Sequence, residues 1–380
     1  MWLEKIKIQN FRNLKNCKNN FLNTLNLITG KNAQGKTNFL EAIYYLCALN
    51  SFRSTSELDL INWEENYFHI KSEIQNNDKK NTLEVSVLKQ NNSISEGGKI
   101  KITKQIKIDG KSKTLLKDYL TCVKTIYFSP DDLLIIKGSP SLRREFFDIG
   151  LSLVDAEYRQ ILLRYQKVLK HRNSLLETIS KGICSYDALK PWNEQLVDTG
   201  TFIIKKRLEY IEKLLPYAIE IMYKISSAKE NFDIKYISFF QDKNCDIKAR
   251  FIEKLEEIKN YEIIRNTTLV GPHKDDVTFY INSKDAKSFC SQGQIRTICL
   301  GLKLAQLGLV ELKFNCTPIL LLDDVFSELD NLRSRFVLET ILAKNIQTFI
   351  TTTTIKELDK DFVQQARIFT IESGRLNETD

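Results

Sequence analysis

Short apolar runs and helical spacings alternate along both ends of the chain. Ile319–Leu322 form an uninterrupted apolar run, which is typical of a central strand in a parallel sheet. Leu25, Leu27 and Ile28 predict another short buried strand. The segment after it places Phe39, Leu40, Ile43, Tyr44 and Leu46 on one side of a helix. This alternation of buried strands and amphipathic helices predicts an α/β fold.

The middle of the chain has a helical pattern instead. Residues 153–179 and 192–225 place apolar side chains near one face of each predicted helix, and Pro216 is expected to bend or end the second. We therefore predict an inserted, mainly helical lobe over residues 131–264, between head segments 1–130 and 265–380. Basic side chains are assigned to the outer face of the first helix (Arg164, Lys167, Lys170, His171 and Arg172).

A further helix has an unusual entrance. Ile295, Ile298, Leu300, Leu302, Leu304, Leu307 and Leu309 surround most of the helix that follows "SQGQ", so this helix should be largely buried. Ser291 can cap it, and Gly293 leaves space around the backbone. An ordinary N-cap is one interpretation. The other is an anion site, since a helix N-terminus favours phosphate.

Charge and cysteine usage narrow the class of protein. The chain has 380 residues and a formal net charge of +8, which suits a nucleic-acid or other polyanionic partner better than an acidic one. Its eight cysteines are scattered singly without a C-x-x-C pair, which indicates reduced thiols rather than zinc or disulfides. The start "MWLEKIKIQNF" has no apolar core of a signal peptide, and no run is long enough for a membrane span. We expect a soluble cytoplasmic protein with no membrane partner.

A complete phosphate-binding motif follows the first predicted strand. Gly30-Lys31-Asn32-Ala33-Gln34-Gly35-Lys36-Thr37 matches G-x-x-x-x-G-K-[ST] between a strand and a helix. In such a P-loop the backbone N–H groups cradle phosphate, Lys36 reaches the β- and γ-oxygens, and Thr37 ligates Mg²⁺. A chance match is disfavoured by the strand–loop–helix context. The segment predicts an ATP–Mg²⁺ site in which Lys36 is also catalytic.

Two carboxylates end the other buried strand. Asp323 and Asp324 follow Ile319–Leu322 directly, where parallel strands present their carboxyl ends. We expect Asp323 to hold Mg²⁺ and Asp324 to polarise an attacking water. Capping of the next helix is the simpler alternative, and the P-loop makes it less favoured.

The order of these motifs resembles that of ABC-type ATPases. Ser291, Gln292, Gly293 and Gln294 stand where that class has its signature, and Asp330 stands in its D-loop. The resemblance implies that the signature of one subunit closes on the γ-phosphate held by the P-loop of a second. ATP then joins two subunits, and Asp330 lies across the dimer.

Several motifs together resemble the RecF family of bacterial recombination mediators, which have SMC-like ATPase heads. They are "IQNFRNL" (8–14), "GKNAQGKTNFLEAI" (30–43), "SFRS" (51–54), "FSPDDLLIIKGSPSLRREFFD" (128–148), "LVGPHKDD" (269–276), "SQGQIR" (291–296) and "LLLDDVFSELD" (320–330). The resemblance covers essentially the whole chain. It implies an ABC/SMC-like head with a mixed sheet, ATP-dependent homodimerisation, and binding to single-stranded and gapped DNA. It further implies RecO and RecR partners, recombinase loading and support of the SOS response.

The same resemblance suggests further contacts. Arg12 and Asn13 match residues that approach the nucleotide in SMC-like heads, with a simple turn as the alternative. Arg143 and Arg144 are candidates for DNA contact, or else solvated charges. His273 is expected to order its loop, with DNA or nucleotide contact as the lesser alternative.

Two departures from the usual ABC-type sequence pattern, and the distance between the P-loop and the signature, bear on the predicted activity. Asp324 stands where most ABC ATPases carry Glu, and Thr351–Thr354 stand where a switch His is common; both favour a slow switch over a fast motor. About 250 residues separate Lys36 from Ser291, more than a transporter subunit uses. This spacing disfavours a transporter ATPase, and a small-molecule kinase would leave "SQGQIR" without a role. Both are kept as alternatives, together with a structural SMC-like clamp.

Overall fold

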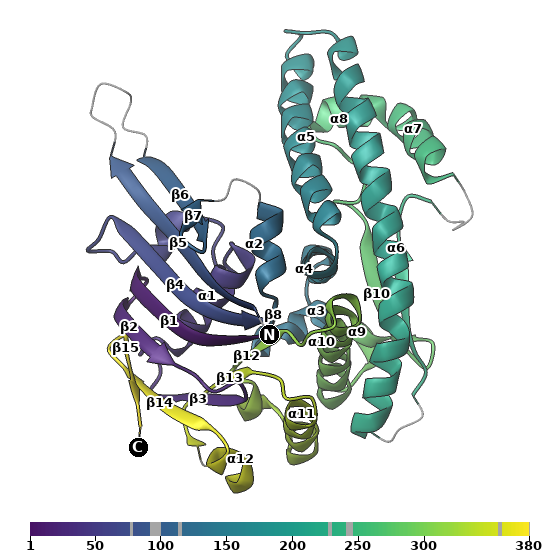
Figure 1. Cartoon of the computed structure of the whole chain (residues 1–380). Coiled ribbons are helices and arrows are strands. Elements are labelled where there is room, and N and C mark those ends of the chain that lie inside the picture. The colour runs from purple at the N-terminus through teal and green to yellow at the C-terminus, as the bar shows by residue number, and fades with distance from the viewer. Residues whose placement is uncertain are drawn as a thin grey trace. The chain divides into compact units, whose positions relative to one another are not determined.

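The computed structural model describes residues 1–76, 79–91, 100–112, 116–226, 230–240, 246–355 and 359–379. The chain divides into two units (Figure 1). Unit 1 comprises Met1–Pro130 and Val310–Asp380, and unit 2 comprises Asp131–Leu309. The first border coincides with the predicted start of the helical lobe. Unit 2 runs past residue 264, because a small sheet and most of the helix after "SQGQ" contribute to its core.

Unit 1 contains two six-stranded sheets. The first is antiparallel wherever its strands pair and has the order β2-β1-β4-β5-β6-β7. Its strands are β1 (Trp2–Phe11), β2 (Leu14–Asn20), β4 (Tyr67–Asn76), β5 (Lys79–Asn91), β6 (Ile100–Ile108) and β7 (Lys111–Ser112). Alternating apolar side chains on β1 and β4 bury one face of this sheet, as expected for antiparallel strands with one solvated face.

The second sheet is mixed and has the order β15-β14-β3-β13-β12-β8. All its pairs are parallel except β14–β15. Its strands are β3 (Leu25–Thr29), β8 (Thr125–Phe128), β12 (Ile319–Asp323), β13 (Thr348–Thr352), β14 (Arg367–Glu372) and β15 (Arg375–Glu378). β12 is buried throughout and pairs in parallel with β13 and β8, which confirms the prediction for Ile319–Leu322.

Helix α1 (Lys36–Ala48) contacts strands of both sheets and supplies much of the core of unit 1. Phe39, Leu40, Ile43 and Leu46 are fully buried, as their helical spacing predicts. The other helical elements of unit 1 are η1 (Glu57–Leu60), α2 (Leu116–Cys122), η5 (Val325–Glu328), α11 (Asn331–Ala343) and α12 (Lys360–Gln364). α1 starts at Lys36, the P-loop lysine. Burial of α1 therefore holds the end of the P-loop against the core of unit 1.

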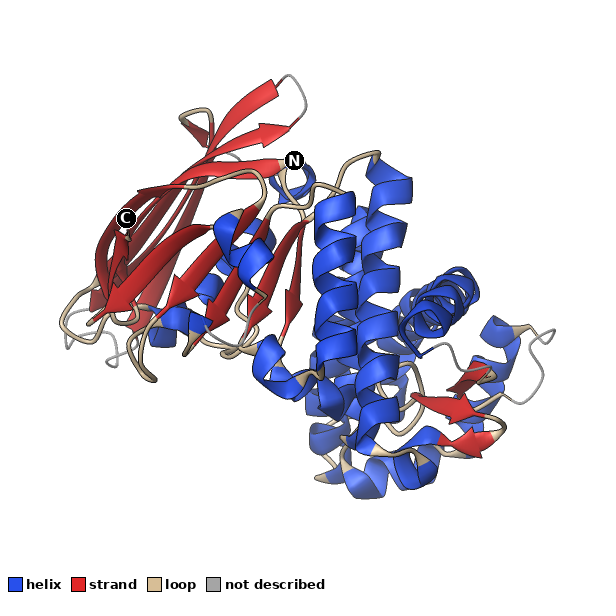
Figure 2. Ribbon diagram, turned by 90° about the horizontal axis from the view of Figure 1, so that it is seen from below, coloured by secondary structure: helices blue, strands red, loops and turns tan. Residues whose placement is uncertain are grey.

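Unit 2 is mainly helical, and Figure 2 shows its helices in blue with one small sheet in red. Its sheet has the order β11-β10-β9, with β9 (Phe232–Ile237), β10 (Asp276–Ile281) and β11 (Lys284–Asp285). Its helical elements are α3 (Leu134–Lys137), α4 (Pro140–Val154), α5 (Ala156–Ser180), η4 (Tyr186–Leu189), α6 (Lys190–Ser226), α7 (Ile247–Glu257), α8 (Lys259–Arg265), α9 (Ala286–Phe289) and the part of α10 (Gln292–Phe314) that precedes Val310. The turn η3 (Pro130–Leu133) joins the two units in sequence.

The long helices α5 and α6 lie side by side (Figure 1). Both were predicted, but α6 continues through Pro216 instead of ending there. Proline removes one backbone N–H, which leaves the carbonyl of Glu212 without its helical donor. Glu212 and Pro216 are both exposed, so water can satisfy that carbonyl and the helix can continue.

The side chain of Arg172 does not lie on the outer face of α5, so the prediction made from its charge is wrong. Its side chain is fully buried, and Nη2 lies 2.6 Å from Oε2 of the fully buried Glu262. Nη1 donates to Thr268 Oγ1 at 2.8 Å and Nε to Asn193 Oδ1 at 2.8 Å. Helical spacing marks which face is buried but not whether a buried charge finds a partner, so this ion pair could not be predicted.

Membrane spans, disulfides and metal clusters were each sought among the residues that the structure describes. In the described ranges, no helix combines the length and apolarity needed to cross a bilayer. The seven cysteines within those ranges are all free thiols. No cluster of three or more His, Cys, Asp or Glu side chains suited to a metal ion occurs among the described residues.

Candidate ATP site

A cavity of about 860 Å³ lies in unit 1 at the start of α1. The P-loop contributes one wall, and the carboxylates after β12 contribute another. Predicted site residues from three separate stretches line it (Arg12, Asn13, Asn32, Ala33, Gly35, Lys36, Thr37, Asp323 and Asp324). Within unit 1 the fold therefore brings together most of the residues predicted to bind ATP, whereas Gly30, Lys31 and Gln34 of the same loop do not line the cavity.

The P-loop lysine closes the loop on itself. Lys36 Nζ donates to the carbonyl oxygens of Gly30 at 2.6 Å and Lys31 at 3.2 Å. Burial lowers the pKa of Lys36 from its usual value, and the carboxylates of Asp324 and Asp323 counteract part of this shift. The ammonium group thus lies within electrostatic reach of both acids, where a bound phosphate can compete for it.

Gly35 shows why the loop needs glycine. Its φ of 118° lies in a region that side chains rarely adopt, and a Cβ there would lie 2.9 Å from Oδ1 of Asn13. Asn13 in turn donates from Nδ2 to the carbonyl of Gln34 at 3.1 Å. Asn13 therefore supports the P-loop from the turn between β1 and β2, which gives this predicted residue a defined position beside the loop.

Asp323 is held by three hydroxyl groups. Thr37 Oγ1 donates to its Oδ1 at 3.1 Å, Thr351 Oγ1 donates to the same oxygen at 2.7 Å, and Tyr127 donates to Oδ2 at 3.0 Å. Hydroxyl and carboxylate oxygens are ligands that Mg²⁺ prefers. Thr37 and Asp323, the two predicted metal ligands, are therefore suitably paired for one ion.

Asp324 follows in a left-handed conformation, with φ 53° and ψ 27°. Aspartate tolerates this region better than most side chains. Its backbone N–H donates to Thr351 Oγ1 at 3.0 Å, and Ser327 Oγ donates to its carbonyl at 2.7 Å. Neighbouring groups thus fix the main chain of Asp324 at the edge of the cavity.

Arg12 is anchored rather than free. Its Nη2 donates to Glu41 Oε1 at 2.7 Å, its Nε donates to Oε2, and Nη1 donates to the carbonyl of Asp59 at 3.2 Å. Glu41 is fully buried on α1 and also accepts a hydrogen bond from Ser51. Arg12 lines the cavity, but its guanidinium first serves to connect the turn after β1 with α1.

The predicted signature residues lie in unit 2, whereas the P-loop lies in unit 1. Ser291 and Gln294 form a capping box: Gln294 N–H donates to Ser291 Oγ at 3.2 Å, and Ser291 N–H donates to Gln294 Oε1 at 2.9 Å. Ser291 and Gln292 are exposed, and Gly293 is half-buried. Each protomer therefore caps α10 internally, and the predicted contact with a second subunit stays a prediction.

Asp330 is likewise a helix cap in the single chain. Its carboxylate accepts a hydrogen bond from the N–H of Arg333 at 2.9 Å at the start of α11 and forms an ion pair with the Arg333 side chain. Asp330 is exposed, so its predicted position across a dimer also stays a prediction.

Arg143 and Arg144 both make contacts inside unit 2. Arg143 is 5% exposed, and its Nε and Nη2 donate to the two carboxylate oxygens of Asp276 at 2.7 and 2.8 Å. Arg144 is half-buried and donates to the carbonyl of Asp275 at 2.6 Å. The two hydrogen bonds to Asp276 occupy the Arg143 guanidinium inside unit 2. This geometry does not support the predicted contact of Arg143 with DNA.

His273 orders its loop, in line with the prediction. Its Nδ1 and Tyr165 OH lie 2.6 Å apart, and Nε2 lies 3.1 Å from the carbonyl of Thr268. Burial lowers the pKa of His273 to about 4, so the imidazole is neutral near pH 7. The "GPHKDD" segment therefore acts within the core of unit 2.

Several residues that line the cavity or contact Asp323 were not among the predicted site residues. Tyr127 and Thr351 orient Asp323, and Lys15, Arg53 and Trp63 line the cavity. Arg53 could have been found because it lies in the motif "SFRS". Thr351 could have been found because it lies at the end of a parallel strand. The others come from strands and turns whose sequences contain no nucleotide-binding motif.

The fold and the cavity define a P-loop ATPase head of the ABC/SMC class. An Smc head bound to the C-terminal winged-helix domain of ScpA shares the fold over 100% of this chain and 97% of that chain, at TM-score 0.54 and 15% identity. The family model described as "RecF/RecN/SMC N terminal domain" matches residues 2–377. The chain belongs to the RecF family, which confirms the resemblance seen in its motifs.

Curated relatives match this chain over almost its full length and theirs. DNA replication and repair protein RecF of Natranaerobius thermophilus is 38% identical, covering 98% of this chain and 97% of the relative. That of Bacillus cytotoxicus is 37% identical, covering 99% and 98%. The structure described as "recombination mediator protein RecF-ATPrS in RecFOR pathway" has TM-score 0.88 and 34% identity, covering 100% of this chain and 98% of that chain. These names favour replication and repair over transport.

Proposed function

We propose that this chain is an ATP-dependent DNA-binding protein of DNA replication and recombinational repair. The observation that carries the proposal is the joint placement of Lys36, Thr37, Asp323 and Asp324 around one cavity. Such a set binds and hydrolyses a nucleoside triphosphate. A relative of similar fold is named as an ATP complex, which supports ATP as the nucleotide.

Each residue has a distinct role in this proposal. The loop Gly30–Thr37 offers backbone N–H groups to phosphate, and Lys36 exchanges its loop carbonyls for β- and γ-oxygens. Thr37 and Asp323 hold Mg²⁺, which neutralises phosphate charge when bound. Asp324 accepts a hydrogen bond from the attacking water. Because Asp is one methylene shorter than Glu, we propose slow hydrolysis that acts as a switch. We propose separately that DNA stimulates it, in keeping with a DNA-repair family.

ATP binding would then control assembly. In a homodimer, Ser291, Gln292, Gly293 and Gln294 of each subunit meet the γ-phosphate of the other, where the dipole of α10 favours an anion. Asp330 closes the same interface. The dimer clamps single-stranded or gapped DNA in the cytoplasm and helps RecO- and RecR-type partners to load recombinase, in support of the SOS response.

Sedimentation velocity with and without ATP–Mg²⁺ tests this proposal, repeated with single-stranded, duplex and gapped DNA. We expect a monomer alone, a dimer with ATP–Mg²⁺, and DNA bound by the dimer. Lys36→Ala is the control, because it removes the charge that holds the phosphates. A wild-type chain that stays monomeric at saturating ATP would contradict ATP-driven dimerisation.

A further inference from the structure

Trp63 is an exception to the usual burial of large aromatic side chains. Its side chain is 99% exposed, although an indole exposes a large apolar surface to water. It lines the same cavity as Gly35, Lys36 and Thr37. A bare aromatic ring at a polar site is a feature that folding alone does not explain.

The turn that carries Trp63 is held rigidly at its backbone. Asn62, which precedes it, is buried; its N–H donates to the carbonyl of Asn10 at 2.9 Å and its Nδ2 to that of Arg12 at 2.6 Å. Asn62 Oδ1 accepts from the N–H of Glu64 at 3.0 Å. The backbone that carries the indole is therefore held in place, so binding a planar ligand requires little ordering of this turn.

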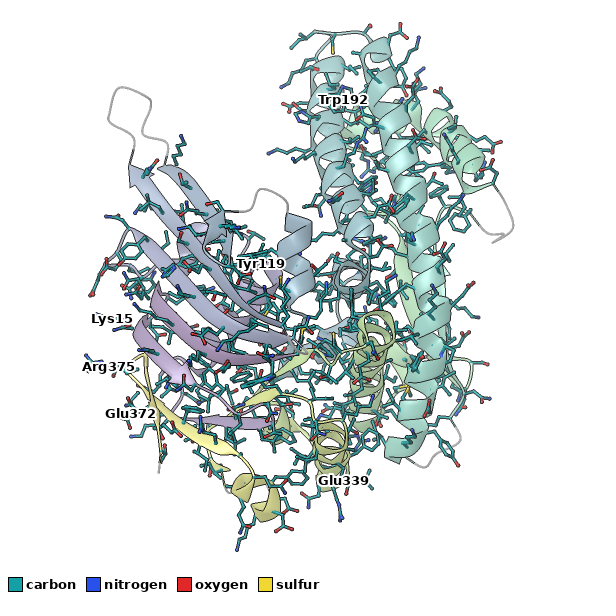
Figure 3. All side chains as sticks on the ribbon, in the orientation of Figure 1. Lys15, Tyr119, Trp192, Glu339, Glu372 and Arg375 are labelled. Atoms are coloured by element: carbon teal, nitrogen blue, oxygen red, sulfur yellow. The ribbon has the colours of Figure 1, made fainter. Side chains whose placement is uncertain are left out.

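The cavity has two chemically different regions. Gly35, Lys36 and Thr37 supply backbone N–H groups and a cation, which suit phosphate. The turn with Trp63 supplies an aromatic surface, and next to it Lys15 Nζ pairs with Glu64 at 2.9 Å. Lys15 projects from β2 (Figure 3). Because its charge is already balanced by Glu64, the indole is the distinctive binding surface of this region.

We propose that the nucleobase of the bound triphosphate stacks on the indole of Trp63. The proposal rests on the proposed function, in which the P-loop binds the phosphates of the same nucleotide. Trp63 is then a binding residue that anchors the base and leaves the chemistry to the P-loop and the carboxylates.

Stacking has a characteristic energetic signature. Every base has a π-face, so an aromatic surface holds different bases with similar strength. Loss of the ring should weaken nucleotide affinity between about 5-fold and about 150-fold, the range that alanine substitution of a stacking residue gives. ATP and GTP should lose similar factors, and Trp63→Phe should retain most of the affinity.

Calorimetric titration of ATP, GTP and inorganic tripolyphosphate tests this proposal on wild type, Trp63→Ala and Trp63→Phe. We expect Trp63→Ala to weaken both nucleotides and to leave tripolyphosphate unchanged, because tripolyphosphate lacks a base. Indole fluorescence gives a second readout: ATP should quench the wild type, and most of that change should vanish in Trp63→Phe. Trp192→Phe is the matched control, since Trp192 stacks on His171 in unit 2.

The outcomes separate this inference from the proposed function. Equal ATP affinity in wild type and Trp63→Ala overturns the stacking, even if Lys36→Ala abolishes binding. Equal loss of ATP and tripolyphosphate in Trp63→Ala also overturns it, since the ring would then act on the phosphate site. If wild type binds neither ATP nor tripolyphosphate, the proposed function itself fails.

Discussion

Arg12 and Glu41 form a two-point ion pair in the wall of the candidate ATP site, with Nη2 of Arg12 2.7 Å from Oε1 of Glu41. The Glu41 side chain is fully buried and that of Arg12 is 20% exposed. Ser51 donates to Glu41 as well, so the carboxylate connects the turn after β1, α1 and the loop after α1. The position of the P-loop helix thus depends on a buried charge.

We expect Glu41→Gln to destabilise unit 1 by about 3 kcal/mol, because a partly buried guanidinium then lacks its counter-charge. Urea unfolding measures the change. Glu64→Gln is the control, since Glu64 pairs with Lys15 at the exposed surface, where such pairs contribute little. Equal unfolding free energies for wild type and Glu41→Gln would show that the pair does not hold the helix.

Asp324→Asn should keep ATP affinity and slow hydrolysis by about 10²- to 10⁴-fold, because the amide no longer accepts the proton of the attacking water. Mg²⁺ ligation by Asp323 persists, so the ATP-bound dimer should accumulate. Phosphate release and sedimentation measure the two effects. Glu328→Gln removes a nearby exposed carboxylate and should leave the rate unchanged. Hydrolysis by Asp324→Asn at the wild-type rate would assign the base elsewhere.

Ser291→Arg should leave ATP binding by the monomer intact and prevent ATP-dependent dimerisation. Arginine keeps positive potential at the start of α10, but its long side chain occupies the space through which the γ-phosphate of the partner subunit would approach Ser291. Ser291→Ala is the matched control, since it removes the capping hydrogen bond to Gln294, at a cost of about 1 kcal/mol, without adding bulk. If both variants dimerise normally with ATP, Ser291 is a helix cap and no more.

His273 and Asp275 should give unit 2 opposite pH dependences. Burial lowers the pKa of His273 from 6.5 to about 4, so its contribution to stability is present above pH 6.5 and is lost as the pH falls through 4. Burial raises the pKa of Asp275 from 3.8 to about 6, so its contribution is present below pH 3.8 and is lost as the pH rises through 6. Between pH 4 and 6 the two partly cancel in the wild type.

His273→Gln should remove one of the two opposing effects. From pH 4 to 6.5 the unfolding free energy of the variant should fall relative to wild type by about 3 kcal/mol, as the shift of the His273 pKa implies. Asp275→Asn should show the opposite trend. Urea unfolding across this pH range decides the point through the slope of the difference, and parallel curves for wild type and both variants would refute it.

The local elements of the nucleotide site could be predicted from the sequence alone. The P-loop needs Gly30, Gly35, Lys36 and Thr37 at fixed spacing because glycine, a cation and a hydroxyl each do one local task. The apolar run before Asp323 likewise predicts a buried parallel strand, because only a strand covered on both faces is apolar throughout.

Tertiary structure alone decided which polar side chains lie inside. Arg172 and Arg143 are buried although both are charged, and their burial depends on Glu262 and Asp276, residues distant in sequence that the fold brings into contact. Tyr127 and Thr351 reach Asp323 only because β8 and β13 flank β12. Trp63 is exposed on a turn that Asn62 anchors to the carbonyl of Arg12 just after β1, a contact between positions 50 residues apart. Local patterns report spacing along the chain, whereas charge pairing and exposure depend on which distant segments meet.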